Sequence, residues 1–253
     1  MGLNPAGVTE DAARHPFLFT NMAKKQYVQE MFDHISPTYD KLNHILSLSI
    51  DKSWRKKAVR MIADRQPQQV LDIACGTGDF SIALAKAGVP KVLGIDISEG
   101  MMTIGRAKIE QQGLSDRIRF QQEDSEAMSF AEASFDAVSV AFGIRNFEHR
   151  ERALQEIYRV LRPGGILMVL ELSVPGNRIL RGLYKLYFLH VLPAVGKMIS
   201  HDPAAYKYLP ASVLNFPSPE TFGQMVRDAG FSRVESKALT FGLCRIFTGI
   251  KSA

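Results

Sequence analysis

An apolar segment that runs into a glycine turn is the feature that most constrains the fold of this chain. Residues 70–74, Val-Leu-Asp-Ile-Ala, form a short apolar run, and Gly76-Thr77-Gly78 follows after one residue. A run of this kind bounded by glycine predicts a buried strand that ends in a tight turn. In doubly wound sheets, ligands bind beyond the carboxyl ends of such strands, where glycine allows close approach of the backbone.

Short strands and helices alternate from this point onward, which predicts a parallel sheet with helices on both faces. Right-handed crossovers then make this α/β sheet doubly wound. Two strands near the C-terminus, joined by a turn at Phe241-Gly242, predict a hairpin that completes a mostly parallel, seven-stranded sheet. The strands are expected at residues 70–74, 91–95, 118–122, 135–140, 166–170, 233–239 and 243–250, and the helices between them at 80–86, 98–113 and 148–161.

The remaining segments predict additions to one domain. We expect a loose leader over residues 1–20 and a single domain over residues 21–253. Residues 21–66 have helical patterns and are expected to form an N-terminal lid. The alternation stops after residue 175, and residues 175–216 are expected to form a helical cover inserted after the fifth strand. The helical patterns of the lid lie at 24–35 and 53–63, and Ser218 is expected to cap a last helix before Gly230.

Composition restricts the class of protein. The chain has 253 residues, 46% of them hydrophobic, so one sizeable core is expected. There is no apolar run long enough to span a membrane and no signal-peptide pattern, and two cysteines do not make a disulfide framework. We therefore expect a cytoplasmic protein. The net charge of +5 comes from scattered Lys and Arg without a nucleic-acid-binding motif, so no nucleic-acid partner is expected.

Glycine turns of this type also bind dinucleotides, but two residues argue against that ligand. Ser81 replaces the third glycine of G-x-G-x-x-G, and Asp79 stands where a pyrophosphate would meet the helix N-terminus. S-adenosylmethionine has no phosphate and carries a sulfonium and an amine, which suit an acidic site. Asp72 ends the first strand, and Asp96 ends the second, where it can accept hydrogen bonds from a ribose diol. The sequence therefore predicts S-adenosylmethionine, with a nicotinamide dinucleotide as the alternative.

Asp124 follows the third strand and extends the predicted site. Its carboxylate can accept a hydrogen bond from the exocyclic amine of adenine, and the backbone of Ser125 can meet the ring edge. The alternative is a loop aspartate that caps the next turn. The histidines lack metal-ligand spacing, so no metal is expected.

Three further stretches resemble a known family. They are residues 39–47 (YDKLNHILS), residues 142–146 (FGIRN) and residues 159–173 (RVLRPGGILMVLELS), with Trp54 shortly after the first. The chain resembles the class I S-adenosylmethionine methyltransferases and, within them, the menaquinone/ubiquinone biosynthesis C-methyltransferases, which have a Rossmann-like fold. The resemblance runs from about residue 32 to the C-terminus. Asp51 and Arg162 depart from the residues that are common in the family, as does Ala141.

The resemblance implies a set of residues around the cofactor. Thr77 and Ser125 would contact it together with the acidic residues named above. Ala141 occupies a position that can touch the methionine end, and here that contact would have to come from the backbone. The complete expected set is Asp72, Gly76, Thr77, Gly78, Asp96, Ile97, Asp124, Ser125 and Ala141.

The implied reaction is methylation of a ring carbon on a reduced polyprenyl quinone. The ring becomes nucleophilic when a neighbouring hydroxyl loses its proton, so a developing negative charge must be stabilised. Arg145 is the candidate cation, and the alternative is a structural ion pair with a nearby carboxylate. Asn146 is a candidate for orienting Arg145. Tyr39, beside Asp40, is a candidate lid residue over the site, with an ordinary cap or packing role as the alternative.

The expected partner is a lipophilic quinol, with demethylmenaquinol favoured and the benzoquinol of ubiquinone biosynthesis as the alternative. Methylation of another lipophilic small molecule, or a binding module without turnover, are further alternatives. Residues 178–192 combine apolar and basic side chains, which would suit a prenyl tail or peripheral contact with an anionic membrane surface. A helix that only buries its apolar face is the alternative there. The sequence leaves open whether the chain forms a homo-oligomer.

Overall fold

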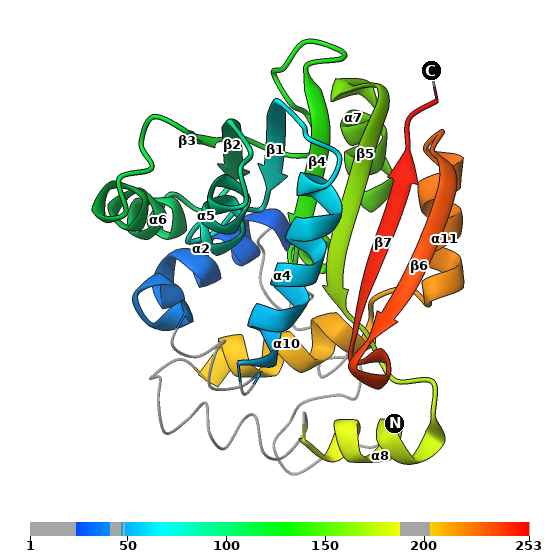
Figure 1. Cartoon of the computed structure of the whole chain (residues 1–253). Helices are drawn as coiled ribbons and strands as arrows, with labels where there is room; N and C mark the ends of the chain where they lie inside the picture. The colour runs from blue at the N-terminus through cyan, green and yellow to red at the C-terminus, as the bar shows by residue number, and fades with distance from the viewer. Residues whose placement is uncertain (1–23, 41–46, 48, 188–202, 253) are drawn as a thin grey trace.

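A seven-stranded sheet runs through the computed structural model, which describes residues 24–40, 47, 49–187 and 203–252. The expected leader at residues 1–20 lies outside the described residues. The strand order is β3-β2-β1-β4-β5-β7-β6 (Figure 1). The strands are β1 (Gln69–Ile73), β2 (Lys91–Asp96), β3 (Ile118–Gln122), β4 (Phe135–Ala141), β5 (Leu161–Leu172), β6 (Ser232–Leu239) and β7 (Cys244–Ile250).

The pairing confirms the predicted doubly wound, mostly parallel sheet. β1 pairs in parallel with β2 on one side and with β4 on the other, while β7 is antiparallel to both β5 and β6. The chain moves outward from β1 to β3 and returns to β4 on the far side of β1. The strand order therefore reverses between β1 and β4, and the carboxyl ends of these two strands mark the crevice where such sheets bind ligands.

Helices cover both faces of the sheet because the central strands are apolar on both sides. On one face, α4 (Ile50–Ala63), α5 (Asp79–Lys86) and α6 (Glu99–Gln111) pack onto the sheet, with Ile62 and Leu84 buried in that layer. On the other face, α7 (Arg150–Val160) and α11 (Pro219–Asp228) contribute Ile157 and Phe222. Leu71 of β1 lies in this second layer. The core is thus a three-layer α/β/α sandwich, as Figure 1 shows.

Several predicted boundaries are wrong by a few residues. The helix expected to end at residue 161 ends at Val160, and the strand expected at 166–170 extends over Leu161–Leu172. Leu161 pairs with Phe135 before an irregularity in the register, and regular pairing with β4 resumes at Ile166. Residues on both sides of Pro163-Gly164-Gly165 therefore pair with β4. The sequence analysis had predicted these three residues as a break between the helix and the strand.

Shorter elements gather at the carboxyl edge of the sheet. They are α2 (Lys24–Ile35) and the 3-10 turn η2 (Ser36–Thr38) before the sheet, η3 (Ile144–Asn146) after β4, and α8 (Arg178–Leu186) and α10 (Pro203–Leu214) after β5. The 3-10 turn η5 (Thr240–Gly242) joins the strands of the hairpin. Figure 1 shows α2 and α10 beyond the ends of the central strands. No helix among the described residues is long and apolar enough to cross a membrane.

Candidate active site

A cavity opens at the carboxyl ends of β1, β2 and β4, where the topology predicts a ligand site. It contains about 730 Å³ of space, part of it open to solvent, which is within the usual range for a small-molecule site. Most of the residues predicted from sequence to contact a cofactor or substrate meet here. Those that line this main cavity are Gly76, Asp96, Ile97, Asp124, Ser125, Ala141, Asn146 and Tyr39.

A smaller adjoining cavity of about 380 Å³ receives other predicted residues. It shares Tyr39, Gly76 and Ala141 with the main cavity and is lined in addition by Asp72 and Thr77. The two cavities therefore meet at the glycine turn. Gly78, which the sequence also placed at the ligand, lines neither cavity and instead caps the N-terminus of α5 with a φ of 82°.

The backbone after β1 and β4 is held in unusual conformations. Ala74 and Phe142 have positive φ values of 54° and 61°, which non-glycine residues adopt infrequently. Gly143 lies so close to Ala74 that a Cβ added at Gly143 would overlap the Ala74 side chain. Strain of this kind concentrates at functional sites. The two loops therefore approach each other closely where they line the cavity, a contact that was not predicted from the sequence.

Asp96 organises the turn between the first two strands. Its Oδ2 accepts a hydrogen bond from Gly76 N at 2.8 Å, and its Oδ1 accepts one from Ser98 N at 2.9 Å. Burial raises the pKa of Asp96, while these backbone donors oppose part of the rise. Each carboxylate oxygen can accept a second hydrogen bond, so Asp96 can bind a diol and hold the glycine turn at the same time.

Asp72 lies at the end of β1 and is almost completely buried. Its two oxygens accept hydrogen bonds from Ser81 Oγ at 2.6 Å and Ser139 Oγ at 2.7 Å. Burial raises the pKa of Asp72 to about 6, although both hydroxyl donors act in the opposite direction. A cation bound beside Asp72 would restore its charged form.

Asp79 does not act as the bare negative charge that the sequence analysis assumed. It forms an ion pair with Lys108 of α6, and its other oxygen lies 3.6 Å from Arg55 Nη1. Asp79 lines the adjoining cavity but not the main one. Because two cations compensate its charge, repulsion of a pyrophosphate by Asp79 is not supported, and the choice of cofactor depends on the other residues.

Asp40, from the segment resembling the family motif, contacts the glycine turn directly. Its Oδ1 accepts a hydrogen bond from Thr77 Oγ1 at 2.5 Å, and its Oδ2 accepts one from Lys108 Nζ at 2.9 Å. This contact ties the N-terminal segment to the turn and engages the hydroxyl of Thr77, a residue predicted to contact the cofactor. Residues 41–46 of the same motif lie outside the described residues.

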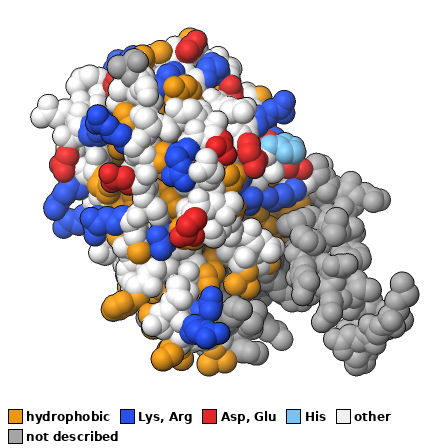
Figure 2. Space-filling model, turned by 90° about the vertical axis from the view of Figure 1, so that its right-hand side faces the viewer, with side chains coloured by type: hydrophobic (Ala, Val, Ile, Leu, Met, Phe, Trp, Pro, Cys, Tyr) orange, Lys and Arg blue, Asp and Glu red, His pale blue; other side chains and the backbone are white. Residues whose placement is uncertain are grey.

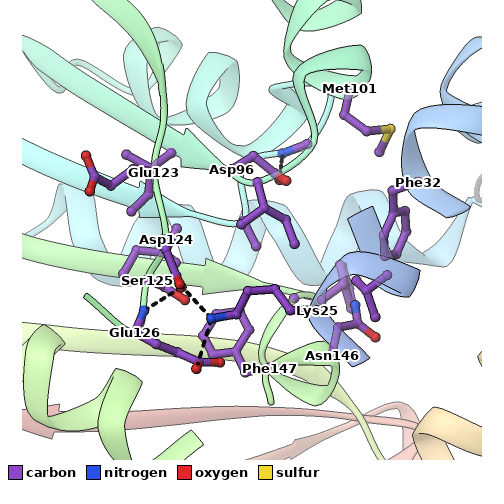
Figure 3. Close-up of a pocket in the computed structure, with 18 of the residues that line it drawn as sticks. Lys25, Phe32, Asp96, Met101, Glu123, Asp124, Ser125, Glu126, Asn146 and Phe147 are labelled. Atoms are coloured by element: carbon purple, nitrogen blue, oxygen red, sulfur yellow. Dashed lines mark hydrogen bonds and ion pairs between the residues drawn. The ribbon is translucent and has the colours of Figure 1, made fainter. Parts of the chain in front are cut away.

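Asp124 is joined to the N-terminal helix, as Figure 3 shows. Lys25 Nζ donates to Asp124 Oδ2 at 2.6 Å and to Glu126 Oε2 at 3.2 Å. Asp124 Oδ1 accepts a hydrogen bond from Glu126 N at 2.9 Å, so the turn-capping role weighed as an alternative is present. The sequence analysis did not predict Lys25 and Glu126 as site residues, because the two are 101 positions apart in the sequence and meet only in the fold.

Arg145 makes the structural ion pair that was its alternative role. Its Nη1 donates to Glu171 Oε1 at 2.7 Å, and both side chains are buried. Burial acts to lower the pKa of Arg145, but the Glu171 carboxylate and the nearby Tyr39 outweigh it, so the pKa is raised. Arg145 therefore stays charged, and Glu171 at the end of β5 is a site residue that the sequence analysis missed.

Asn146 and Tyr39 line the main cavity and contact the helices α10 and α2 outside the sheet. Tyr208 of α10 donates from its hydroxyl to Asn146 Oδ1 at 3.1 Å, so Asn146 is oriented by the insertion. Asn146 was predicted to orient Arg145, but this hydrogen bond joins Asn146 to Tyr208 instead. Tyr39 packs edge-on against Phe32 of α2, with ring centroids 5.9 Å apart. Its packing role is thus present, and Tyr39 also lines both cavities.

Metal and thiol chemistry find no support among the described residues. No three His, Cys, Asp or Glu side chains of this part of the chain form a group that could hold a metal ion. Cys75 in the glycine turn is buried, and burial raises the pKa of its thiol well above the ordinary value. A thiol in that state is a poor nucleophile, which agrees with the packing role expected for it.

Comparisons with known proteins agree with this geometry. The model of the ubiE/COQ5 methyltransferase family matches residues 20–251. A demethylmenaquinone methyltransferase of Bacteroides fragilis is 46% identical over 92% of this chain and 96% of its own length. A ubiquinone/menaquinone biosynthesis C-methyltransferase of Geobacter sulfurreducens is 42% identical over 90% of both chains.

Solved structures support the fold alone. The [4+2]-cyclase SpnF superposes with a TM-score of 0.69 at 18% identity, covering 92% of this chain and 98% of that one. An S-adenosylmethionine-dependent methyltransferase of Thermotoga maritima superposes with a TM-score of 0.61 at 21% identity, covering 88% and 99%. The first of these is named as a cyclase, so the fold by itself does not specify the reaction.

Proposed function

The chain belongs to the ubiE/COQ5 methyltransferase family, and we propose that it methylates a ring carbon of reduced demethylmenaquinone. It is an S-adenosylmethionine-dependent methyltransferase with the Rossmann-like class I fold. The observation that carries the acceptor assignment is the near full-length match to demethylmenaquinone methyltransferases. The two cavities around the glycine turn support it, because together they offer space for a nucleoside, for the methionine end of the cofactor and for an aromatic acceptor.

The residues at the strand ends fit S-adenosylmethionine. Asp96 has lone pairs left for the ribose hydroxyls, and Asp124 can accept from the adenine amine beside Ser125. Asp72 borders the adjoining cavity and suits the amino group of the methionine end, since a cation there favours the charged carboxylate. When bound, the cofactor supplies an activated methyl group for in-line displacement.

We propose that residues at the end of β4 and directly after it act on the acceptor. Ala141 and Asn146 line the main cavity, so an aromatic ring beside them would lie next to the β4 edge. Arg145 directly precedes Asn146 in the sequence, and its guanidinium is held in an ion pair with Glu171 and stays protonated. We assign to it the stabilisation of negative charge on the acceptor ring. Tyr39 and three residues of α2 line one side of the main cavity.

Contact with a membrane surface would give access to a polyprenyl substrate. On α8, Ile179, Leu183 and Leu186 share one face and are 75%, 60% and 56% exposed, while Tyr184 packs inward. Arg178 and Arg181 lie outside this apolar face and are also exposed. Figure 2 shows hydrophobic side chains beside basic ones at the lower end of the molecule, where Figure 1 places α8.

An amphipathic helix with this arrangement suits an anionic lipid surface, with its apolar face in the interface. We therefore propose that α8 docks on the membrane from which the quinol is drawn. Flotation with anionic liposomes should carry the wild type and not Leu183→Glu, while Leu214→Glu, changed at an exposed leucine of α10, should float like the wild type. Equal flotation of both variants would contradict docking through α8.

A benzoquinol acceptor is the second candidate, because several relatives are named for ubiquinone as well as menaquinone biosynthesis. The two acceptors can be separated by competition. Equal concentrations of reduced demethylmenaquinone and of the reduced, unmethylated benzoquinone are incubated with enzyme and S-adenosylmethionine, and both products are measured. Predominant methylation of the naphthoquinol supports the proposal, and predominant methylation of the benzoquinol contradicts it.

A further inference from the structure

The turn of the C-terminal hairpin carries a largely exposed aromatic side chain. Phe241 of η5 is 82% exposed, more than any other large hydrophobic residue that the structure describes. Cys244, just after the turn, pairs with Leu172 at the carboxyl end of β5. The turn therefore lies at the same edge of the sheet as the active site, and Figure 1 shows it in red at the lower end of the hairpin.

The backbone of this turn holds the aromatic ring outward in a strained conformation. Thr240, Phe241 and Gly242 all have positive φ values, of 44°, 57° and 91°. Glycine or asparagine normally occupies such positions in a hairpin turn, and a bulky residue there is an outlier. The stability of the turn therefore does not explain the phenylalanine, and outliers of this kind point to a functional role.

Hydrogen bonds on both sides of the turn fix its position. Trp54 of α4 donates from Nε1 to Thr240 Oγ1 at 2.8 Å. Ser173, just after β5, donates from Oγ to the carbonyl oxygen of Gly242 at 2.7 Å. The Phe241 ring thus projects from a turn that is attached to α4 and to the end of β5.

The turn also lies beside the segment that leads into α8. A Cβ added at Gly242 would lie 3.5 Å from Pro175 Cα. Leu243, the next residue, packs in the cluster that contains Tyr184 on the inner side of α8. The outer face of α8 exposes the three apolar residues described above. An exposed aromatic turn and an exposed apolar helix face are therefore neighbours at one edge of the molecule.

The charged residues of these two segments have one sign. Residues 172–187 and 236–246 together contain five Lys and Arg and no Asp or Glu. Among them, Arg178, Arg181 and Lys237 are exposed. Apolar side chains accompanied by basic ones suit the interface of an anionic bilayer. The apolar groups project singly from a turn and a helix, which fits fluid lipid better than a protein surface, since protein interfaces need close shape complementarity.

We propose that the hairpin turn inserts Phe241 into the interface of an anionic membrane, as a second attachment point beside α8. The inference rests on the proposed function, since it takes the acceptor to be a polyprenyl quinol dissolved in that membrane. A single helix in the interface leaves the protein free to rotate about the helix axis. A second point outside the helix removes this freedom and turns the carboxyl edge of the sheet, which carries the active site, toward the bilayer.

Site-specific labelling tests the insertion, because both native cysteines, Cys75 and Cys244, are buried. Phe241→Cys carrying the dye NBD is mixed with vesicles of phosphatidylcholine and phosphatidylglycerol. We expect its emission to move to shorter wavelength and to be quenched by lipids brominated on the acyl chains. Glu132→Cys, labelled in the same way, is the control, since Glu132 is exposed before β4 at the opposite edge of the sheet and its dye should not respond.

Phe241→Asn separates membrane binding from folding. Asparagine tolerates the left-handed backbone, so the unfolding temperature of this variant should be unchanged or higher. Its partition onto the same vesicles should fall roughly tenfold, as the loss of one buried aromatic ring implies. Phe241→Trp should bind as well as the wild type, because tryptophan favours the membrane interface. With demethylmenaquinol, kcat/KM of Phe241→Asn should fall in vesicles and equal the wild-type value in detergent micelles.

The outcomes distinguish this inference from the proposals on which it rests. If the wild type binds vesicles but the dye at residue 241 stays in water, or if Phe241→Asn binds equally well, insertion by the turn is overturned while docking through α8 stands. Absence of vesicle binding by the wild type overturns both attachment points. A dye response without lipid that depends on protein concentration shows that a second copy covers Phe241, and the proposal fails. Vesicle binding that depends on Phe241 in an enzyme that does not methylate demethylmenaquinol supports insertion and rejects the proposed acceptor.

Discussion

Asp33 of α2 accepts a hydrogen bond from Ser98 Oγ at 2.6 Å, and the same oxygen accepts a second one from Gly100 N at 2.9 Å. The N-terminal helix is therefore attached to the first turn of α6, next to Asp96. A Cβ added at Gly100 would lie 2.9 Å from the Asp33 carboxylate, so close docking depends on glycine there. Through this attachment α2 holds Lys25, Val28 and Phe32 over the main cavity.

Asp33→Ala should loosen this cover. Loss of hydrogen bonds to a charged group costs about 1.5–3 kcal/mol, so we expect S-adenosylmethionine to bind roughly tenfold more weakly. Calorimetric titration measures the affinity, and limited proteolysis within residues 24–40 reports on detachment. Glu30→Ala is the matched control, since Glu30 is exposed on the same helix and pairs only with Gln26 in the contacts described. Wild-type affinity in Asp33→Ala would contradict the role of α2 as a cover.

The pair Arg145–Glu171 separates structural from catalytic roles. Glu171→Gln should destabilise the fold by about 3–5 kcal/mol, because it leaves a buried guanidinium without its counter-charge. Arg145→Met combined with Glu171→Met should regain most of that stability. If Arg145 acts on the acceptor, turnover of this folded double variant should still fall by about 100-fold or more. Denaturant unfolding and steady-state rates measure the two effects, and near wild-type turnover of the double variant would remove Arg145 from the mechanism.

Asp72 should make stability depend on pH. Its pKa is raised from 3.8 to about 6 in the folded protein, so the folded state holds the proton more tightly than the unfolded state. The corresponding stability is full below the unfolded value and is lost as the pH rises through about 6, a change of roughly 3 kcal/mol. Asp72→Asn cannot ionise, and its unfolding free energy should lack this loss between about pH 4 and pH 8.

Denaturant titrations at several pH values compare the two proteins. Ser139→Ala, which removes one hydroxyl donor from Asp72, should raise its pKa further and move the transition to higher pH. The same slope in Asp72→Asn as in the wild type would assign the pH dependence to another group.

Gly105 of α6 sets the distance between this helix and the glycine turn. A Cβ at Gly105 would lie 3.1 Å from the backbone carbon of Thr77 and 3.2 Å from its oxygen, besides overlapping the Phe120 ring. Gly105→Ala should therefore displace the turn, lower stability by about 1–3 kcal/mol and weaken cofactor binding.

Gly182 of α8 is the matched control, because a Cβ there would meet nothing within 4 Å. Gly182→Ala should be neutral or stabilising by up to about 1 kcal/mol, as expected from helix propensity. Thermal unfolding and calorimetric titration of both variants check the pair. Equal effects of the two substitutions would contradict a specific role for Gly105.

The sheet was predictable because its signals are local. The apolar runs around Leu71 and Val138 and the glycine turn at Gly76 each lie within a few residues. The alternation of strands and helices then leaves few topologies. Boundaries were less certain: Leu161 joins β5 only because Phe135 pairs with it, and such pairing is not visible in the sequence around residue 161.

The site was predictable where residues follow strand ends and not where distant segments meet. Asp96 and Asp124 were found in this way, because parallel strands bring their carboxyl ends to one edge. Lys25, Asp33 and Glu171 were missed. Lys25 contacts Asp124 from 99 positions away, Glu171 contacts Arg145 from 26, and Asp33 contacts Ser98, near Asp96, from 65. The sequence around each is that of an ordinary helix or strand. The role assumed for Asp79 was wrong for the same reason, because Lys108 is 29 positions away.

Transfer of a radiolabelled methyl group tests the central claim most directly. The enzyme is incubated with methyl-labelled S-adenosylmethionine and reduced demethylmenaquinone, and the quinones are extracted and separated. The account predicts label in menaquinone, in amounts equal to the S-adenosylhomocysteine formed. Binding of S-adenosylmethionine with no label in the extracted quinone would contradict it.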